Sequence, residues 1–172
     1  MNDEMQITSG EHAVNLPQVQ IRPLGSGEDA TAFRTLNEEW ITRYFTLEKM
    51  DREVLSDPEN KIFREGGHIF MAYLGQRAVG CVALIAMGGG VYELSKMAVA
   101  PDLRGLGIGR SLLEHAVTQA KRLGARSLFL ASNAKLQNAV HLYESIGFRH
   151  LPPDRRPASL YTRANVFMEM SL

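Results

Sequence analysis

The sequence predicts an α/β (α+β) domain built on a mixed β-sheet, and a change of pattern near the middle of the chain is the main reason. Residues 91–100 are mostly apolar and end at Pro101, which has no backbone N–H to donate to a neighbouring strand. From Ile108 to Leu123 the apolar residues instead follow helical spacing, and residues 127–132 form a second apolar strand. Two strands joined by one crossover helix lie parallel, so the sheet contains a parallel pair.

The other elements follow from similar patterns. A Gly75-Gln76 turn between two apolar runs predicts an antiparallel hairpin. In chain order we expect strands at residues 19–24, 68–74, 78–87, 91–100, 127–132, 148–151 and 161–172. We expect helices around Phe33 and Leu36, from Leu47 to Leu55, from Ile108 to Leu123 and from Leu136 to Ile146. Gly124 and Gly147 close the last two, and Asn133 is the expected N-cap of the last one.

Length and composition limit the classes of function. The chain has 172 residues, of which 45% are hydrophobic, and we expect one domain at 19–172 after a loosely ordered extension at 1–18. Nineteen basic and nineteen acidic side chains cancel, so no general charge attracts nucleic acid or a membrane surface. No apolar run is long enough to span a membrane. The single cysteine, Cys81, lies in an apolar run and indicates a buried thiol in a reducing, cytoplasmic setting.

A glycine-rich segment begins the predicted central helix. Gly105, Gly107 and Gly109 alternate between Arg104 and Arg110. Each glycine costs about 0.8–1 kcal/mol of helix propensity relative to alanine. Bare amides at a helix N-terminus bind anions, so we interpret Arg104–Arg110 as a pyrophosphate cradle. The alternative is a tight turn in which glycine only shapes the backbone. The segment lacks the Gly-Lys-Ser/Thr ending of a nucleoside triphosphate loop.

The same segment resembles the signature of the GCN5-related N-acetyltransferase (GNAT) superfamily, to which Arg104, Gly107 and Gly109 correspond. Residues 138–148, which begin with Asn138 and end with Gly-Phe, resemble its second cofactor motif. The likeness covers residues 19–172. It implies a mostly antiparallel sheet split between two parallel central strands, with about four flanking helices. It also implies acetyl-CoA as co-substrate and no metal, and none of the five histidines forms a metal-ligand pattern.

The resemblance assigns roles to individual residues. The backbone amides of Met97 and Val99 would position the pantetheine arm and the thioester carbonyl. Tyr143 corresponds to the tyrosine that protonates the departing thiolate, and Asn138 to a cofactor-binding asparagine; the alternatives are core packing and a helix start. The full set of expected cofactor-binding residues is Met97, Ala98, Val99, Arg104, Gly105, Leu106, Gly107, Ile108, Gly109, Arg110, Asn138 and Tyr143.

Acyl transfer to an amine also requires a base, because an alkyl ammonium with a pKa near 10.4 must lose a proton before it attacks. Glu93 is the candidate base, since it lies four residues before Met97, where the superfamily often has a glutamate. The alternative is a solvated strand carboxylate. Lys96 belongs to the same strand and needs a partner if it is buried.

The resemblance also implies that the first two helices and their connection form the wall of the acceptor pocket. Trp40 and Tyr44 would line it beside Phe45, and with Glu38 or Glu39 such an aromatic wall would favour a cationic amine. Helical spacing also allows the three aromatic residues to be core residues. Arg155 and Arg156 could hold an anionic group of the acceptor or belong to a charged surface loop.

The resulting prediction is an acetyl-CoA-dependent N-acetyltransferase that acts on a primary amine of a small molecule by direct attack. Three alternatives stay open: a longer-chain acyl-CoA as donor, a protein or peptide amine as acceptor, and a non-catalytic acyl-CoA sensor. Homodimers are common in the superfamily, and the sequence does not decide whether this chain forms one.

Overall fold

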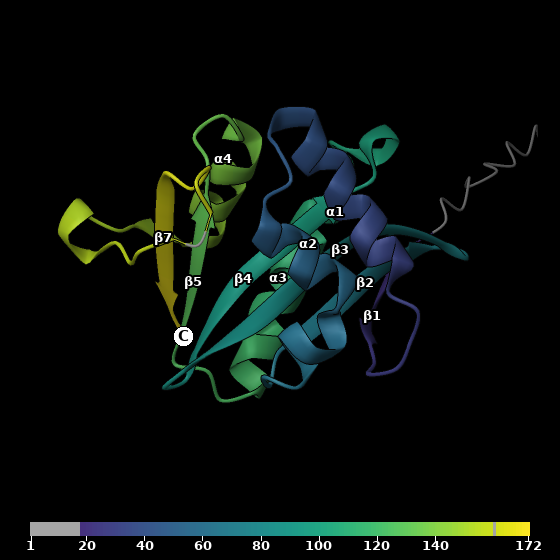
Figure 1. The fold of residues 1–172 in the computed structure, drawn as a ribbon, viewed down its shortest axis with the longest axis horizontal. Helices are drawn as coiled ribbons and strands as arrows, with labels where there is room; N and C mark the ends of the chain where they lie inside the picture. Colours follow the sequence, from purple (N-terminus) through teal and green to yellow (C-terminus); the bar gives the residue numbers. More distant parts are fainter. Residues whose placement is uncertain (1–17, 160) are drawn as a thin grey trace, which may run out of the picture.

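A computed structural model describes residues 18–159 and 161–172, so the expected extension at 1–18 lies almost entirely outside the described residues. One seven-stranded sheet has the order β1-β2-β3-β4-β5-β7-β6 (Figure 1). The strands are β1 (Val19–Leu24), β2 (His68–Leu74), β3 (Arg77–Gly88), β4 (Val91–Val99), β5 (Ser127–Ser132), β6 (Arg149–His150) and β7 (Val166–Ser171). The helices are α1 (Thr31–Tyr44), α2 (Lys49–Ser56), α3 (Ile108–Arg122) and α4 (Gln137–Ile146). The sequence of elements is the predicted one.

The sheet is antiparallel everywhere except between β4 and β5. These two strands pair in parallel over three residues each, from Val91 with Ser127 to Glu93 with Phe129. Beyond this short ladder they separate, and the ribbon opens into a V between them (Figure 1). This confirms the predicted fold class, a mixed sheet split between two parallel central strands.

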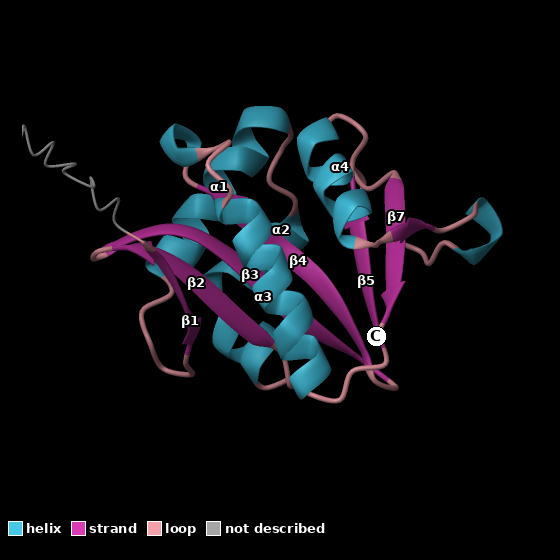
Figure 2. Ribbon diagram, turned by 180° about the vertical axis from the view of Figure 1, so that it is seen from behind, coloured by secondary structure: helices cyan, strands magenta, loops and turns pink. Residues whose placement is uncertain are grey.

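Helices cover both faces of the sheet and bury two separate apolar cores. α3 crosses one face, where Leu112, Leu113 and Ala116 are fully buried against the sheet (Figure 2). α1 and α2 lie on the opposite face, where Phe33 and Ile41 are fully buried. At the end of α3, Gly124 has a φ of +76°, and the amides of Gly124 and Ala125 bond back to Lys121 and Ala120. Glycine closes the helix as predicted, because this backbone conformation suits a residue without Cβ.

Two sequence-based expectations are wrong, and both concern the chain next to β5. The last strand begins at Val166 and not at residue 161, because residues 161–165 form a turn. The Asn165 side chain accepts a hydrogen bond from the Ala134 amide at 2.9 Å, and this holds the turn against the end of β5. Asn133 is not the cap of α4, whose N-cap is Leu136. Asn133 instead donates to the Arg163 carbonyl at 2.6 Å.

In the connection between α2 and β2, residues Glu59–Phe63 form a π-helical turn that buries Ile62.

Candidate functional site

A cleft of about 750 Å³ lies where β4 and β5 separate. Its walls are the second half of β4, the 103–110 segment, the first half of α4, the end of α1 and the 161–164 turn. In an open sheet, ligands bind at the carboxyl ends of parallel strands, and the cleft has this position.

The wall formed by β4 offers backbone groups. Pairing with β5 stops at Glu93, so the rest of the β4 edge that faces β5 has no partner in the sheet. The pairing of β4 with β3 also shifts register, because the four residues from Ser95 to Ala98 lie opposite the three residues from Cys81 to Ala83. Lys96 lies in this bulge with a φ of +52°, an uncommon conformation for a residue other than glycine. An extended ligand could therefore hydrogen-bond to β4 as an added strand does.

The next wall is the N-terminus of α3. Gly107 is its N-cap, with a φ of +87° and no side-chain cap, and Gly105 has a φ of +81°. A Cβ at either position would meet no atom within 4 Å, so open space surrounds these glycines. The first amides of α3 lack intrahelical acceptors and carry the positive end of the helix dipole. This wall suits an anion.

Two arginines flank this helix start, and both already have partners. Arg104 donates to Glu39 at 2.9 Å, and Arg110 donates to the Ser145 hydroxyl at 2.9 Å. The second contact links α3 to α4 beside the cleft.

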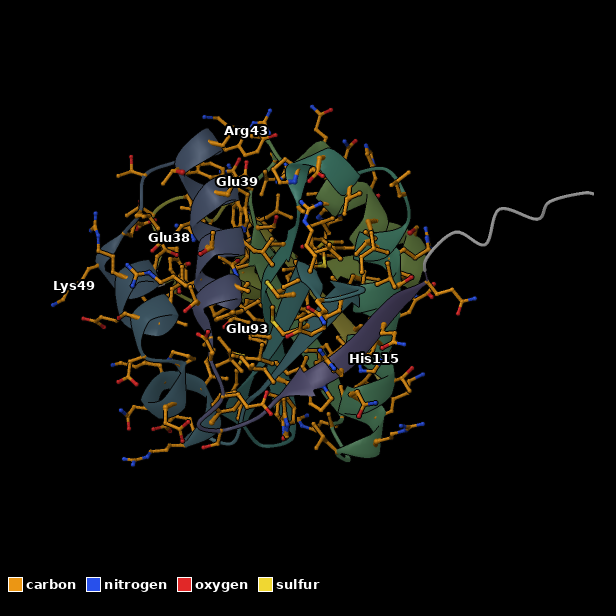
Figure 3. All side chains as sticks on the ribbon, turned by 90° about the vertical axis from the view of Figure 1, so that its right-hand side faces the viewer. Glu38, Glu39, Arg43, Lys49, Glu93 and His115 are labelled. Carbon is orange, nitrogen blue, oxygen red and sulfur yellow. The ribbon has the colours of Figure 1, made fainter. Side chains whose placement is uncertain are left out.

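Glu93 lies on β4 at the point where the two strands begin to separate. It is half-buried and lines the cleft, and it has no hydrogen bond or ion pair to any of the described residues. Burial raises the pKa of Glu93, and the nearby charge of Lys96 opposes this rise. Figure 3 shows Glu93 inside the molecule and Glu38 and Glu39 along α1. A carboxylate with a raised pKa is a stronger base than an ordinary one.

Tyr143 reaches the opposite wall from α4. It is 8% exposed, lines the cleft and packs edge-on against Phe148 with ring centroids 6.0 Å apart. Burial raises the pKa of Tyr143 to about 12, so its hydroxyl stays protonated at neutral pH. It is a permanent hydrogen-bond donor.

The sequence did not reveal a buried ion network beside Glu93. Lys96 donates to Asp51 of α2 at 2.9 Å and to the Tyr161 hydroxyl at 3.0 Å, which supplies the partner that Lys96 was expected to need. Arg163 forms two hydrogen bonds of 2.7 Å to the two oxygens of Asp51. Burial alone would raise the pKa of Asp51, but the bonds from Arg163 and the charge of Lys96 lower it to about 2. Three segments distant in sequence meet in this network.

The aromatic residues of α1 reach the cleft, and their surroundings differ from the expectation. Trp40 is half-buried, Tyr44 is 45% exposed, and both line the cleft, so they are not simply core residues. The expected carboxylates do not join them. Glu38 bonds to Arg34 at 2.7 Å, Glu39 bonds to Arg104, and neither lines the cleft.

The structure gathers nearly all of the predicted site residues around this one cleft. The lining includes the predicted residues Trp40, Tyr44, Glu93, Met97, Ala98, Val99, Arg104, Gly105, Gly107, Ile108, Gly109, Arg110, Asn138 and Tyr143. Leu106 is the exception, because it is 70% exposed and lies outside the lining. Arg155 pairs with Glu169 at 2.9 Å on the surface, and Arg156 bonds to the Leu151 carbonyl. Neither arginine lines the cleft, which agrees with the alternative that both belong to a charged surface loop.

Comparison with known proteins agrees with this geometry. The model of the Acetyltransferase (GNAT) family matches residues 33–148, more than half of the chain. The chain belongs to this family. An uncharacterized N-acetyltransferase from Schizosaccharomyces pombe is 32% identical over 146 residues, which cover 82% of this chain and 83% of that protein.

Solved structures of GNAT proteins share the fold. A GNAT-family acetyltransferase from Staphylococcus aureus Mu50 superposes with a TM-score of 0.79 at 21% identity, covering 90% of this chain and 99% of the other. The PaiA N-acetyltransferase from Thermoplasma acidophilum, solved in complex with coenzyme A, has a TM-score of 0.70 at 20% identity, covering 90% and 99%.

Among the residues that the structure describes, no helix combines the length and apolar character needed to cross a membrane. Nor do three histidine, cysteine, aspartate or glutamate side chains converge as metal ligands anywhere in 18–159 or 161–172.

Proposed function

We propose that this GNAT protein transfers an acetyl group from acetyl-CoA to a primary amine of a small molecule. The unpaired edge of β4, which leads directly into the glycine-capped start of α3, is the observation that carries the proposal. A pantetheine arm is a chain of amides that can pair with such an edge, and a pyrophosphate suits the helix N-terminus that follows. The family membership and the coenzyme A complex of the Thermoplasma relative support the same donor.

Glu93 would prepare the acceptor. An ammonium that enters the cleft meets this carboxylate, which burial has made more basic. Glu93 takes the proton directly or through one water molecule, and the neutral amine attacks the thioester carbon. The carbonyl oxygen gains negative charge in the tetrahedral intermediate, and backbone amides of the β4 bulge at Met97 and Val99 would stabilise it.

Tyr143 would act on the leaving group. Collapse of the intermediate breaks the carbon–sulfur bond and leaves a thiolate, whose conjugate acid has a pKa near 8.5. Because the pKa of Tyr143 is about 12, its phenol is a weaker acid than the thiol it faces. Tyr143 is therefore expected to stabilise the sulfur mainly through a hydrogen bond. The attacking nitrogen loses its extra proton to solvent as the intermediate collapses to the amide, and the thiolate takes up a proton from solvent as the product leaves.

The test is a screen of primary amines with acetyl-CoA, scored by released thiol, together with calorimetric titration of acetyl-CoA. We expect stoichiometric binding and thiol release with at least one amine. Competition with longer acyl-CoA thioesters then defines the chain length of the donor. Tight acetyl-CoA binding without turnover of any small amine would contradict the proposal and favour a sensor.

A further inference from the structure

The charges around the acceptor half of the cleft are almost completely paired. Glu38 of α1 bonds to Arg34, which lies outside the cleft lining, and Glu39 bonds to Arg104 of the lining. Glu48 accepts hydrogen bonds from the Thr162 amide at 2.9 Å and from Arg163 at 3.2 Å. Each of these carboxylates is already committed to the protein's own donors.

Asp51 is the most completely satisfied of the acids. One of its oxygens accepts from Lys96 and Arg163, and the other accepts from Arg163 and from the Glu48 amide at 2.9 Å. Its side chain is fully buried and has no room for a further donor. Glu93 is thus the only carboxylate in the cleft lining, and it has no ion-pair partner among the described residues.

The aromatic faces that could hold a second cation are also occupied. Arg163 lies over Trp40 at 5.8 Å and over Tyr161 at 4.6 Å, and Lys96 lies over Tyr161 at 4.5 Å. The other two rings of α1 and its end also carry cations: Arg43 lies 5.8 Å from the Tyr44 centroid, and Lys135 lies 5.8 Å from that of Phe45. The protein's own cations thus take the places that a polycationic ligand would use.

From this arrangement we propose that the acceptor is a monoamine with an apolar or aromatic body, and that the site rejects diamines and polyamines. This inference rests on the proposed function, because it describes the acceptor of that reaction. One ammonium is recognised by Glu93, and the ring edges contact the body of the molecule. A second ammonium would lie near Lys96 and Arg163, whose counter-charges Asp51 and Glu48 are already paired with them, and near Lys135. It would find no free carboxylate there, and its charge would be repelled by Lys135 in a partly desolvated pocket.

The test compares pentylamine with 1,5-diaminopentane, which differ only in the second amine. With saturating acetyl-CoA we expect kcat/KM for pentylamine to be about tenfold higher or more, although the diamine offers two reactive ends. 2-Phenylethylamine is expected to match or exceed pentylamine. Equal or better use of the diamine would overturn the proposal and leave the acetyltransferase function intact.

Binding gives a second readout that does not need turnover. Trp40 is the only tryptophan of the chain and lines the cleft, so its fluorescence reports occupation of the acceptor half. With coenzyme A bound, pentylamine is expected to change this fluorescence at concentrations about tenfold below those of the diamine. If neither amine releases thiol but this preference persists, the proposed reaction fails while the inferred selectivity stands. If the diamine binds as well as pentylamine, the inference fails.

The Arg163→Gln variant tests whether the positive charge of Arg163 causes the preference for pentylamine over the diamine. Glutamine can still donate to Asp51, but it removes the charge and frees one oxygen of Glu48. We expect the preference for pentylamine over the diamine to fall about fivefold. Arg155→Gln is the matched control, because Arg155 belongs to the same connection but forms an exposed pair with Glu169 away from the cleft, and it should leave the preference unchanged.

Lys135→Gln provides a variant that is not expected to affect folding, because Lys135 is exposed. It should reduce the same preference by a smaller factor, even if Arg163→Gln does not fold. If folded Arg163→Gln or Lys135→Gln protein discriminates between the two amines as strongly as the wild type, the charge argument is wrong.

Discussion

At the scale of single residues, the site contrasts a carboxylate without partners and one with several. Glu93 has no partner in the described part of the chain, so burial raises its pKa. Asp51 is more deeply buried, yet its pKa falls to about 2 because four hydrogen bonds and a lysine charge stabilise the ionised form. The first environment suits a group that exchanges protons, and the second suits a group that holds structure.

Replacing Glu93 by glutamine should remove the base. Wild-type kcat/KM should fall as the pH drops through the Glu93 pKa, which lies above its ordinary value of 4.5, because the protonated carboxyl cannot accept a proton. Glu93→Gln should lower kcat about 100-fold and abolish this acidic limb of the pH profile. The measurement is thiol release between pH 5 and 9. An unchanged limb in the variant would assign proton removal to water.

Replacing Tyr143 by phenylalanine should affect the leaving group and leave the fold intact. We expect kcat to fall about 100-fold while KM for acetyl-CoA changes little. The ring still packs on Phe148, so the melting temperature should stay near that of the wild type. Tyr73→Phe on β2 is the control, since Tyr73 lies outside the cleft lining. If Tyr143→Phe retains the wild-type kcat, Tyr143 only contributes packing.

At the scale of elements, the glycines at the start of α3 have two effects: they allow a backbone with positive φ, and they leave open space beside the first amides of the helix. The positive φ of Gly105 and Gly107 requires residues without Cβ, and open space surrounds both positions. The two explanations weighed from the sequence, a phosphate cradle and a tight turn, are thus compatible in the same residues.

The Gly107→Ala variant separates the backbone effect, which is measured as stability, from the effect of the open space, which is measured as acetyl-CoA affinity. Strain at a φ of +87° should destabilise the fold by about 1 kcal/mol, and the methyl group should weaken acetyl-CoA binding about tenfold or more. Gly75→Ala is the matched control, because Gly75 has a φ of +60° in the β2–β3 turn, also with no atom within 4 Å of an added Cβ. It should show similar destabilisation in urea titrations and unchanged acetyl-CoA affinity. Equal affinity losses in both variants would contradict the cradle.

Most of the elements could be predicted because their signals are local. Pro101, the alternate glycines and the helical spacing after Ile108 define β4 and α3 without reference to the rest of the chain. The turn at 161–165 could not be predicted in this way. Val166, Met168 and Met170 alternate as in a strand, and nothing nearby ends that pattern at residue 165. The turn is fixed by partners far along the chain, such as Glu48 and Asn133.

At the scale of the whole molecule, the ion network joins parts of the fold that do not otherwise meet in the sheet. Asp51 belongs to α2, Lys96 to β4, and Arg163 to the turn before β7. The position of Lys96 in a strand predicted that it would need a partner if buried. The sequence could not identify that partner as Asp51, which lies 45 residues away. Pairing of buried charges over such separations follows from the tertiary fold and leaves no periodic signal.

Asp51→Asn should therefore destabilise the whole fold, by about 3 kcal/mol at pH 7, because Lys96 and Arg163 lose their common counter-charge. The folded-state pKa of Asp51 lies below the ordinary value of 3.8, so its stabilisation is present above that value and disappears as the pH falls through about 2. Wild-type protein should lose about 2 kcal/mol over this window from this group. The Asp51→Asn variant should not show this loss of unfolding free energy at acidic pH.

Urea unfolding at pH 7, 4, 3 and 2 measures both effects. Asp102→Asn is the control, because Asp102 pairs with Arg77 at 2.7 Å on the exposed surface and should have little effect on stability. An equal loss of unfolding free energy in Asp51→Asn and Asp102→Asn would show that burial of the ion network contributes nothing to stability.

The short β4–β5 ladder has a mechanical consequence. One set of three residue pairs joins the two halves of the sheet at the apex of the V, and the Asp51–Arg163 contact links α2 to the turn before β7. The ladder acts as a hinge between the two halves, and the Asp51–Arg163 contact restricts their relative motion. A long ligand that lies between the halves would restrict this motion further. Amide hydrogen exchange in β5 and β7 is thus expected to slow together with that of β4 when the co-substrate binds, although β7 does not line the cleft.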